Sequence, residues 1–231
     1  MKRFMIAFAV TMMLAPIFLA AEDILLYREA KLLQREKQYT EAISAYKKFL
    51  EKFPAIQESS EAHYNIGVCY VRLKDYDNAI NEFNVLVKEF PEKKKAVDAY
   101  MQLGSLYSSK KKQYPEALQM YKTVLEKYPD SPKSADAQFA IGGCYEKMKD
   151  KDNAIAAYKK FIETYPDSKK IERAQEKLSK IQAQNIKKSS LQKKGKSIKK
   201  SKDVPSKKAR KSKSSADAEN REEACPEESE E

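Results

Sequence analysis

A pattern that recurs with a period of about 37 residues constrains the fold of this 231-residue chain more than any other feature. Four segments can be superimposed, each with an alanine followed by a proline at the same interval. The alanines are Ala42, Ala79, Ala117 and Ala154, and their spacings are equal except that the second is one position longer. A nearly constant period of this size indicates structural units that stack on their neighbours.

Each unit has the hydrophobic spacing of two helices. The two apolar stripes of the second unit are Ile66, Tyr70 and Leu73, then Ala79, Ile80, Phe83, Leu86 and Val87. A turn at Lys74-Asp75 separates them, and Pro91 ends the second helix because proline lacks an N–H donor and clashes with the preceding turn. Neither helix is apolar all round, so each unit needs neighbours to cover its apolar face.

Three of the units also carry a longer motif in register. Its residues are His63, Ile66, Gly67, Tyr70, Ala79, Phe83 and Pro91, then Tyr100, Leu103, Gly104, Tyr107, Ala117, Tyr121 and Pro129, and finally Gln138, Ile141, Gly142, Tyr145, Ala154, Tyr158 and Pro166. With this motif the chain resembles the tetratricopeptide repeat (TPR) family, which implies an all-α fold, a TPR α-solenoid. The glycines and the small alanines should let the two helices of a unit approach closely.

The TPR repeat domain is predicted over residues 22–184, followed by a disordered tail over 185–231. It comprises about four repeats, at 23–58, 59–95, 96–133 and 134–170, and a C-terminal capping helix at 169–184. The first repeat departs from the motif at Leu26, Ala30 and Leu33, as terminal repeats often do because one face meets water.

The junctions after Pro129 and Pro166 make each unit about three residues longer than the common 34. Such junctions are similar to those of bacterial envelope TPR proteins. The two similar branches are the BamD-like lipoprotein that supports outer-membrane assembly and the Tol–Pal-associated cell-division coordinator. The chain departs from both, because it has no lipid-acceptor cysteine after its first apolar segment and no coiled-coil segment before the repeats.

Residues 1–21 have the pattern of a signal peptide. Lys2 and Arg3 precede an apolar run, and small residues at Ala20 and Ala21 provide a cleavage site. We therefore expect an exported protein of the periplasm or cell envelope. The alternative is an N-terminal membrane anchor, since the apolar run approaches the roughly 18 residues that a membrane helix needs.

The tail has a basic block at 186–213, with net charge +12, and an acidic block at 214–231, with net charge −7. The basic residues are Lys187, Lys188, Lys193, Lys194, Lys196, Lys199, Lys200, Lys202, Lys207, Lys208, Arg210, Lys211 and Lys213. Sparse apolar residues predict disorder. The basic block could bind anionic lipid or wall polymer, whereas nucleic acid is not expected in an exported protein. Alternatively, the two blocks partly neutralise each other and the tail is simply solvated.

No constellation of residues suggests catalysis. His63 is the only histidine and has no second histidine to complete a metal site or a proton relay. Cys69 and Cys144 are expected to pack as small apolar residues, and Cys225 to be free or to cross-link two chains. We predict no enzyme activity and no cofactor or metal.

The family resemblance implies that the first helix of each repeat lines a concave protein-binding groove. The corresponding residues are Tyr27, Lys31, Tyr64, Asn65, Val68, Arg72, Met101, Gln102, Ser105, Phe139 and Lys147. Aromatic rings beside amides suit an extended peptide or a partner helix, although these side chains could also merely fill the wall of the groove. The predicted function is an exported scaffold for protein–protein interactions, in outer-membrane assembly or cell-division coordination. The alternative is an envelope tether that acts through the basic tail.

Overall fold

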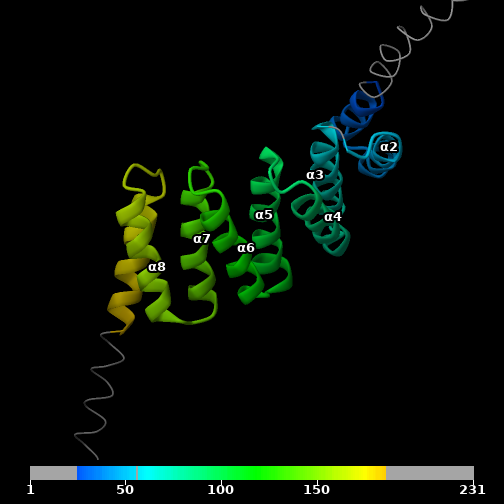
Figure 1. Ribbon diagram of the computed structural model, residues 1–231. Helices are drawn as coiled ribbons and strands as arrows, with labels where there is room; N and C mark the ends of the chain where they lie inside the picture. Colours follow the sequence, from blue (N-terminus) through cyan, green and yellow to red (C-terminus); the bar gives the residue numbers. More distant parts are fainter. Residues whose placement is uncertain (1–24, 56, 186–231) are drawn as a thin grey trace, which may run out of the picture. The chain divides into compact units, whose positions relative to one another are not determined.

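The computed structural model describes residues 25–55 and 57–185; the predicted signal peptide and the tail from residue 186 onward lie outside them. The described residues form helices joined by short turns, without strands (Figure 1). The helices are residues 25–35, α2 (Tyr39–Lys52), α3 (Gln57–Arg72), α4 (Tyr76–Glu89), α5 (Lys94–Leu106), the π-helical turn η1 (Tyr107–Lys111), α6 (Tyr114–Lys127), α7 (Ser134–Lys147), α8 (Lys151–Thr164) and residues 171–185.

From α2 to α8, each helix packs against the next one in the chain. Because only a few residues join them, neighbouring helices run antiparallel (Figure 1). The four helix pairs, in chain order, are residues 25–35 with α2, α3 with α4, α5 with α6, and α7 with α8. Apolar clusters extend through the stack, and the final helix closes one of them with Ala174 and Ile181. The predicted all-α solenoid is confirmed.

The apolar stripes are buried as predicted, with one exception. Ile66 and Phe83 are fully buried, and Tyr70 is half-buried. Leu73, which we placed on the stripe of the first helix, is 44 % exposed because α3 ends at Arg72 and Leu73 lies in the following turn. The prediction for Leu73 was therefore wrong.

The motif glycines face aromatic rings of the second helix in the same pair. A Cβ atom added to Gly67 or Gly142 would lie 2.6 Å from the ring of Phe83 or Tyr158, respectively. Gly104 faces Tyr121 in the same way. Since real side chains do not tolerate such distances, the prediction that these glycines permit close helix approach is confirmed.

The turn inside each helix pair contains a lysine in the left-handed conformation. Lys37, Lys74, Lys112 and Lys149 have φ angles of 65°, 64°, 56° and 61°. In the second pair, the Lys74 amide donates to the Val71 carbonyl at 3.1 Å and the Asp75 amide donates to the Tyr70 carbonyl at 2.9 Å. These are the two hydrogen bonds of a Schellman motif, which ends a helix. Lys74 occupies its left-handed position, which is usually taken by glycine.

The third pair absorbs one additional residue in η1. The interval from Gly104 to Ala117 is one position longer than the equivalent interval from Gly67 to Ala79. Here the Gln113 amide reaches back six positions to the Tyr107 carbonyl, at 2.8 Å. The π-helical turn thus explains why one spacing between the motif alanines is longer than the others, since such turns accommodate insertions within a helix.

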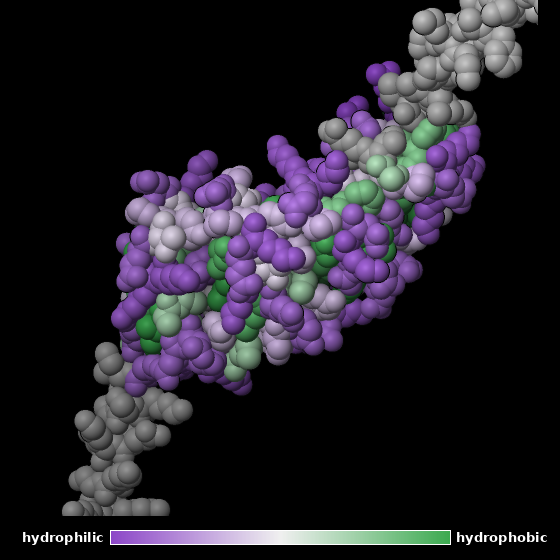
Figure 2. Space-filling model, viewed as in Figure 1, coloured by the Kyte–Doolittle hydropathy of each residue, from purple (hydrophilic) through white to green (hydrophobic). Residues whose placement is uncertain are grey.

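Hydrophilic side chains cover most of the visible face, interrupted by small apolar areas, one of them over the N-terminal helices (Figure 2). The large apolar side chains that remain exposed are Leu25, Leu32, Leu73, Val85 and Met148. Among the described helices, none combines the length and hydropathy needed to cross a membrane.

Candidate interaction site

The structure divides the predicted groove residues by their accessibility. Tyr27 and Phe139 are buried; Tyr64, Asn65, Val68, Met101 and Gln102 are half-buried; Lys31, Arg72, Ser105 and Lys147 are exposed. Only the second and third groups can present much side-chain surface to a partner.

Tyr27 and Asn65 meet at the junction of the first and second units. The Tyr27 hydroxyl donates to Glu61 Oε2 at 2.8 Å, and Asn65 Nδ2 donates to the Tyr27 hydroxyl at 3.4 Å. The Tyr27 ring packs on Tyr46 and Phe49, with centroids 5.8 and 5.3 Å away. Burial, followed by the hydrogen bond to Glu61, raises the pKa of Tyr27. Tyr27 therefore joins two units and belongs to the core.

Phe139 is enclosed on several sides. Its ring lies 5.6 Å from that of Tyr158 and 5.5 Å from that of Phe161, measured between centroids. Lys170 Nζ and the Arg173 guanidinium carbon lie 5.3 and 5.6 Å from the Phe139 centroid. The ring contacts join α7 to α8, and the Arg173 contact joins α7 to the final helix, so an alanine at Phe139 would alter the core as well as any groove.

Tyr64 is also covered by a cation from the following unit. Its ring packs on Phe83 at 5.7 Å, and Lys95 Nζ lies 4.8 Å from its centroid. Lys95 and Lys170 occupy the same position in the period, so this cation–π contact recurs between units. Such contacts contribute about 0.5–1 kcal/mol at accessible sites. The spacing of these lysines from the aromatic positions was a sequence signal that we did not use.

The remaining predicted groove residues are spread over several helices. Val68 and Met101 each pack against an apolar cluster, while the Ser105 carbonyl accepts hydrogen bonds from the hydroxyls of Ser108 and Ser109, at 3.2 and 2.6 Å. Lys31 Nζ lies 5.5 Å from the Tyr27 centroid. Accessible polar or charged groups remain at Gln102, Ser105, Arg72 and Lys147.

The sequence pattern did not lead us to predict the side-chain hydrogen bonds that join the two helices of a pair. Tyr46 donates to Gln34 Oε1 at 2.9 Å, and Tyr158 donates to Glu146 Oε2 at 2.7 Å. Each acceptor lies four positions after the motif position held by Gly142 in the fourth unit. In the second unit, where phenylalanine replaces the tyrosine, Val71 takes the acceptor position. This joint change between repeats could have revealed the pairing.

Two buried serines, Ser59 and Ser134, join successive units. Their hydroxyls donate to the carbonyls of Phe53 and Tyr128, at 2.6 and 2.8 Å. Both serines lie at the start of the first helix of a unit, and both acceptors directly follow the preceding helix. Tyr128 in turn donates from its hydroxyl to the Pro91 carbonyl at 2.6 Å. These bonds satisfy backbone carbonyls left open at helix ends.

His63 packs between helices of the second pair. Its Nδ1 lies 2.9 Å from Glu82 Oε2, and its ring centroid lies 5.9 Å from that of Phe90. Cys69 and Cys144 are buried free thiols, and burial raises the pKa of each to about 11. The described part of the chain contains no group of three or more His, Cys, Asp or Glu side chains arranged to hold a metal.

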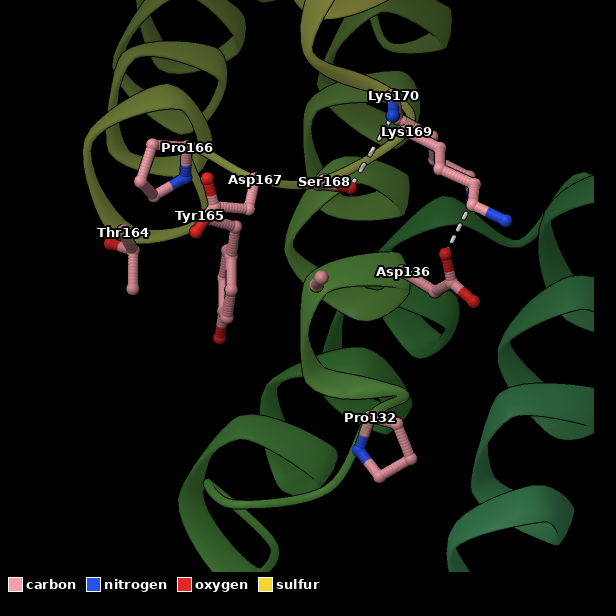
Figure 3. A pocket seen from close by; sticks show the side chains of 10 residues that line it. Pro132, Asp136, Thr164, Tyr165, Pro166, Asp167, Ser168, Lys169 and Lys170 are labelled. Carbon is pink, nitrogen blue, oxygen red and sulfur yellow. Dashed lines mark hydrogen bonds and ion pairs between the residues drawn. The ribbon is translucent and has the colours of Figure 1, made fainter.

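A cavity of about 520 Å³ lies beside the loop between α8 and the final helix (Figure 3). It is lined by Pro132, Ala135, Asp136, Thr164, Tyr165, Pro166, Asp167, Ser168, Lys169 and Lys170. Lys170 Nζ pairs with Asp136 Oδ1 at 2.7 Å, and the Lys170 amide donates to Ser168 Oγ at 3.3 Å. The polar groups of Lys170 are thus engaged, and no predicted groove residue lines this cavity.

The overall fold has solved counterparts at low sequence identity. MamA from Desulfovibrio magneticus RS-1 superimposes with a TM-score of 0.56 and 20 % identity, covering 79 % of this chain and 97 % of that one. A tetratricopeptide repeat protein from Parabacteroides merdae has a TM-score of 0.54 and 20 % identity, covering 71 % of this chain and 60 % of its own. These similarities show the fold alone. No curated protein matches the sequence.

Two family profiles, both described as tetratricopeptide repeat, match the sequence in the region of the helix pairs. One matches residues 27–93, and the other matches residues 98–131 and 136–168. Together they cover more than half of the chain, and they include the three glycine–aromatic contacts. The chain therefore belongs to the tetratricopeptide repeat family.

Proposed function

We propose that this protein is an exported bacterial scaffold that binds other proteins along the first helices of its repeats. TPR repeats are protein-interaction modules and typically serve as scaffolds without enzymatic activity. The observation that carries the proposal is the series of similar helix pairs that leave polar and apolar side chains accessible on those first helices. Binding would involve no covalent step.

The accessible part of α5 is the most direct place to test this binding. Met101 and Gln102 are half-buried and Ser105 is exposed, one helical turn further along. An apolar surface beside an amide and a hydroxyl can contact side chains of a peptide or helix and bond its polar groups. Buried Tyr27 and Phe139 would support the site by holding the units together.

A bulky residue at Ser105 should block partner binding without disturbing the core. We expect Ser105→Arg to reduce cross-linking of native partners in envelope extracts at least tenfold, because the new side chain occupies the accessible face of α5. Gln119→Arg is the matched control, since Gln119 is an exposed polar residue on α6. Equal capture by the two variants would exclude this face of α5 as the binding site.

The proposed location is the periplasm or cell envelope, with a role in outer-membrane assembly or cell-division coordination. The signal-peptide pattern of residues 1–21 and the junctions after Pro129 and Pro166 support it. Cell fractionation should recover the intact chain from the envelope or periplasm, and a variant without residues 2–21 from the cytoplasm. The same distribution for both forms would contradict export through this segment.

A second candidate function is tethering through the tail, supported by the net charge of +12 over residues 186–213. Its partner would be anionic lipid or wall polymer. Full-length protein should bind anionic vesicles in a salt-sensitive manner, since counterions are displaced on contact. Undiminished binding after truncation at Gln184 would rule out the tail as the tether.

A further inference from the structure

The turns inside the four helix pairs share a charged pattern, of which the predicted groove includes only Arg72 and Lys147. In each, two exposed cations flank one other residue. The triplets are Arg35-Glu36-Lys37, Arg72-Leu73-Lys74, Lys110-Lys111-Lys112 and Lys147-Met148-Lys149. We call the edge formed by these turns the cationic turn edge.

The middle residues of the second and fourth triplets are apolar and open to water. Leu73 is 44 % exposed and Met148 is 40 % exposed, although each sits between two charged side chains. Most turn residues at a water-exposed surface are polar. The same departure at equivalent turns of two repeats points to a surface that meets an apolar medium.

The last lysine of each triplet has the left-handed conformation described above. Glycine or asparagine adopts this conformation at lower energetic cost, so the backbone does not account for a lysine in all four turns. A repeated residue that the local conformation disfavours is a reason to look for a function of its side chain. Here that side chain supplies positive charge.

The flanking cations of the second and fourth triplets are available for a partner. Within the described residues, no ion pair involves Arg72, Lys74, Lys147 or Lys149. The acids that directly follow Lys74 and Lys149 bond to their own helices: Asp75 accepts hydrogen bonds from the Asn78 backbone and side chain, and Asp150 accepts the equivalent bonds from Asn153. Asp77 pairs with Lys111 of the third triplet.

Antiparallel packing of consecutive helices places these turns at the same end of their pairs. The turns from α3 to α4, from α5 to α6 and from α7 to α8 follow one another along one edge of the stack (Figure 1). An extended surface could therefore contact several triplets at once.

We propose that the cationic turn edge lies on the surface of an anionic lipid bilayer. Lysine and arginine would contact headgroup phosphates. Leu73 and Met148 would enter the boundary between the headgroups and the acyl chains, as apolar side chains of other interfacial proteins do. A nucleic acid or wall polymer could satisfy the cations but would gain nothing from the two apolar side chains. This site lies in the repeat domain, so it goes beyond both the groove and the proposed tail tether.

Sedimentation of the full-length protein with vesicles of phosphatidylcholine and phosphatidylglycerol would test the apolar part of the site. Leu73→Ser with Met148→Ser should weaken binding about tenfold, since each exposed apolar group contributes about threefold. The matched control is Leu32→Ser with Val85→Ser, because these side chains are 55 % and 39 % exposed but lie outside the triplets. The control should bind within twofold of the unmodified protein.

The cations are tested in the same assay. Arg72→Gln with Lys147→Gln should weaken binding about 25-fold at low salt, at roughly fivefold for each charge removed near an anionic surface. Lys122→Gln with Lys159→Gln, which removes two exposed lysines on second helices, should have a much smaller effect. Unchanged thermal unfolding by circular dichroism would show that all variants fold.

Two outcomes would overturn the proposal. Equal binding by each test pair and its control would leave the tail as the lipid-binding element, and the tether function would survive. Equally tight binding to double-stranded DNA, with no loss in the Leu73→Ser and Met148→Ser variant, would identify a general polyanion surface. Neither outcome would affect the proposed protein-binding groove, which the Ser105→Arg experiment tests separately.

Discussion

At the scale of single residues, three motif glycines pack directly against aromatic rings of the paired helix. Gly142 and Gly143 are adjacent, yet only the first has no room for a methyl group: its added Cβ would lie 2.6 Å from the Tyr158 ring, whereas the nearest atom to that of Gly143 is the Tyr158 hydroxyl at 3.9 Å. Two neighbouring positions on one helix thus have opposite steric requirements.

This difference predicts opposite effects of the same substitution. Gly142→Ala should lower the free energy of unfolding by about 1–3 kcal/mol, because overpacking against Tyr158 outweighs the higher helix propensity of alanine. Gly143→Ala should raise it by up to about 1 kcal/mol, since it gains propensity without a clash. Urea denaturation of both variants measures the effects, and equal destabilisation would contradict the steric explanation.

The lysines in the left-handed conformation also predict opposite effects of one substitution, lysine to glycine, at two positions. Lys37→Gly should raise the free energy of unfolding by about 1 kcal/mol, because glycine adopts a positive φ without the steric cost of a Cβ atom. Lys48→Gly is the control, since Lys48 is an exposed lysine inside α2, where glycine is about 1 kcal/mol less favourable than a good helix former. Thermal unfolding should move upward for Lys37→Gly and downward for Lys48→Gly. A downward shift in both would show that the Lys37 side chain contributes more than its backbone strain costs.

At the scale of elements, the repeats differ mainly in how a turn closes. The turn after Tyr70 ends in Schellman hydrogen bonds, whereas the equivalent turn after Tyr107 includes one residue more and forms η1. Both turns bring the next helix to the same position against its partner, as the equivalent Gly67–Phe83 and Gly104–Tyr121 contacts indicate. The insertion is therefore absorbed locally.

Deletion of one residue distinguishes the two turns. Removing Ser109 should restore the spacing of the other units and change the free energy of unfolding by no more than about 1 kcal/mol, because η1 can revert to a regular helix end. Removing Arg72 from the second unit should cost several times more, since no extra residue is available there and α4 would shift out of register. Denaturant midpoints of the two deletion variants compare them directly. Similar losses of stability in both variants would contradict the interpretation that η1 absorbs one inserted residue.

At the scale of the whole molecule, buried ionisable groups at several points in the stack link stability to pH. Burial raises the pKa of Cys69 and Cys144 from 9.0 to about 11 and that of Tyr121 to about 12. The unfolded chain loses these protons at lower pH than the folded one. The contribution of the two thiols to stability is thus complete below pH 9 and falls as the pH rises toward 11, and that of Tyr121 falls between pH 10 and 12.

Alkaline titration should therefore destabilise the protein gradually. The urea midpoint is expected to fall between pH 9 and 11, with each buried thiol contributing a slope of up to about 1.4 kcal/mol per pH unit. Replacing Cys69 and Cys144 with alanine should lower stability at pH 7 but flatten the fall above pH 9. Parallel curves for the two proteins would show that the thiols ionise alike in both states.

The sequence by itself determined the fold class and the close approach of paired helices. Both depend on local signals, such as the recurring alanines, Gly67 and Pro91, that repeat at a nearly constant period and reinforce one another. The exposed position of Leu73 was missed because helical spacing alone does not show that α3 ends one residue earlier. The predicted signal peptide and the tail from residue 186 onward remain predictions, since they lie outside the described residues.

Only the tertiary structure decided which predicted groove residues are accessible. Tyr27 is bonded to Glu61 of the next unit, and the Tyr64 ring is covered by Lys95 of the unit that follows its own. The tertiary structure also placed the four cationic triplets at equivalent helix ends. A periodic sequence specifies the unit, but the surface left open depends on contacts between units, which arise only when distant side chains meet in the folded stack.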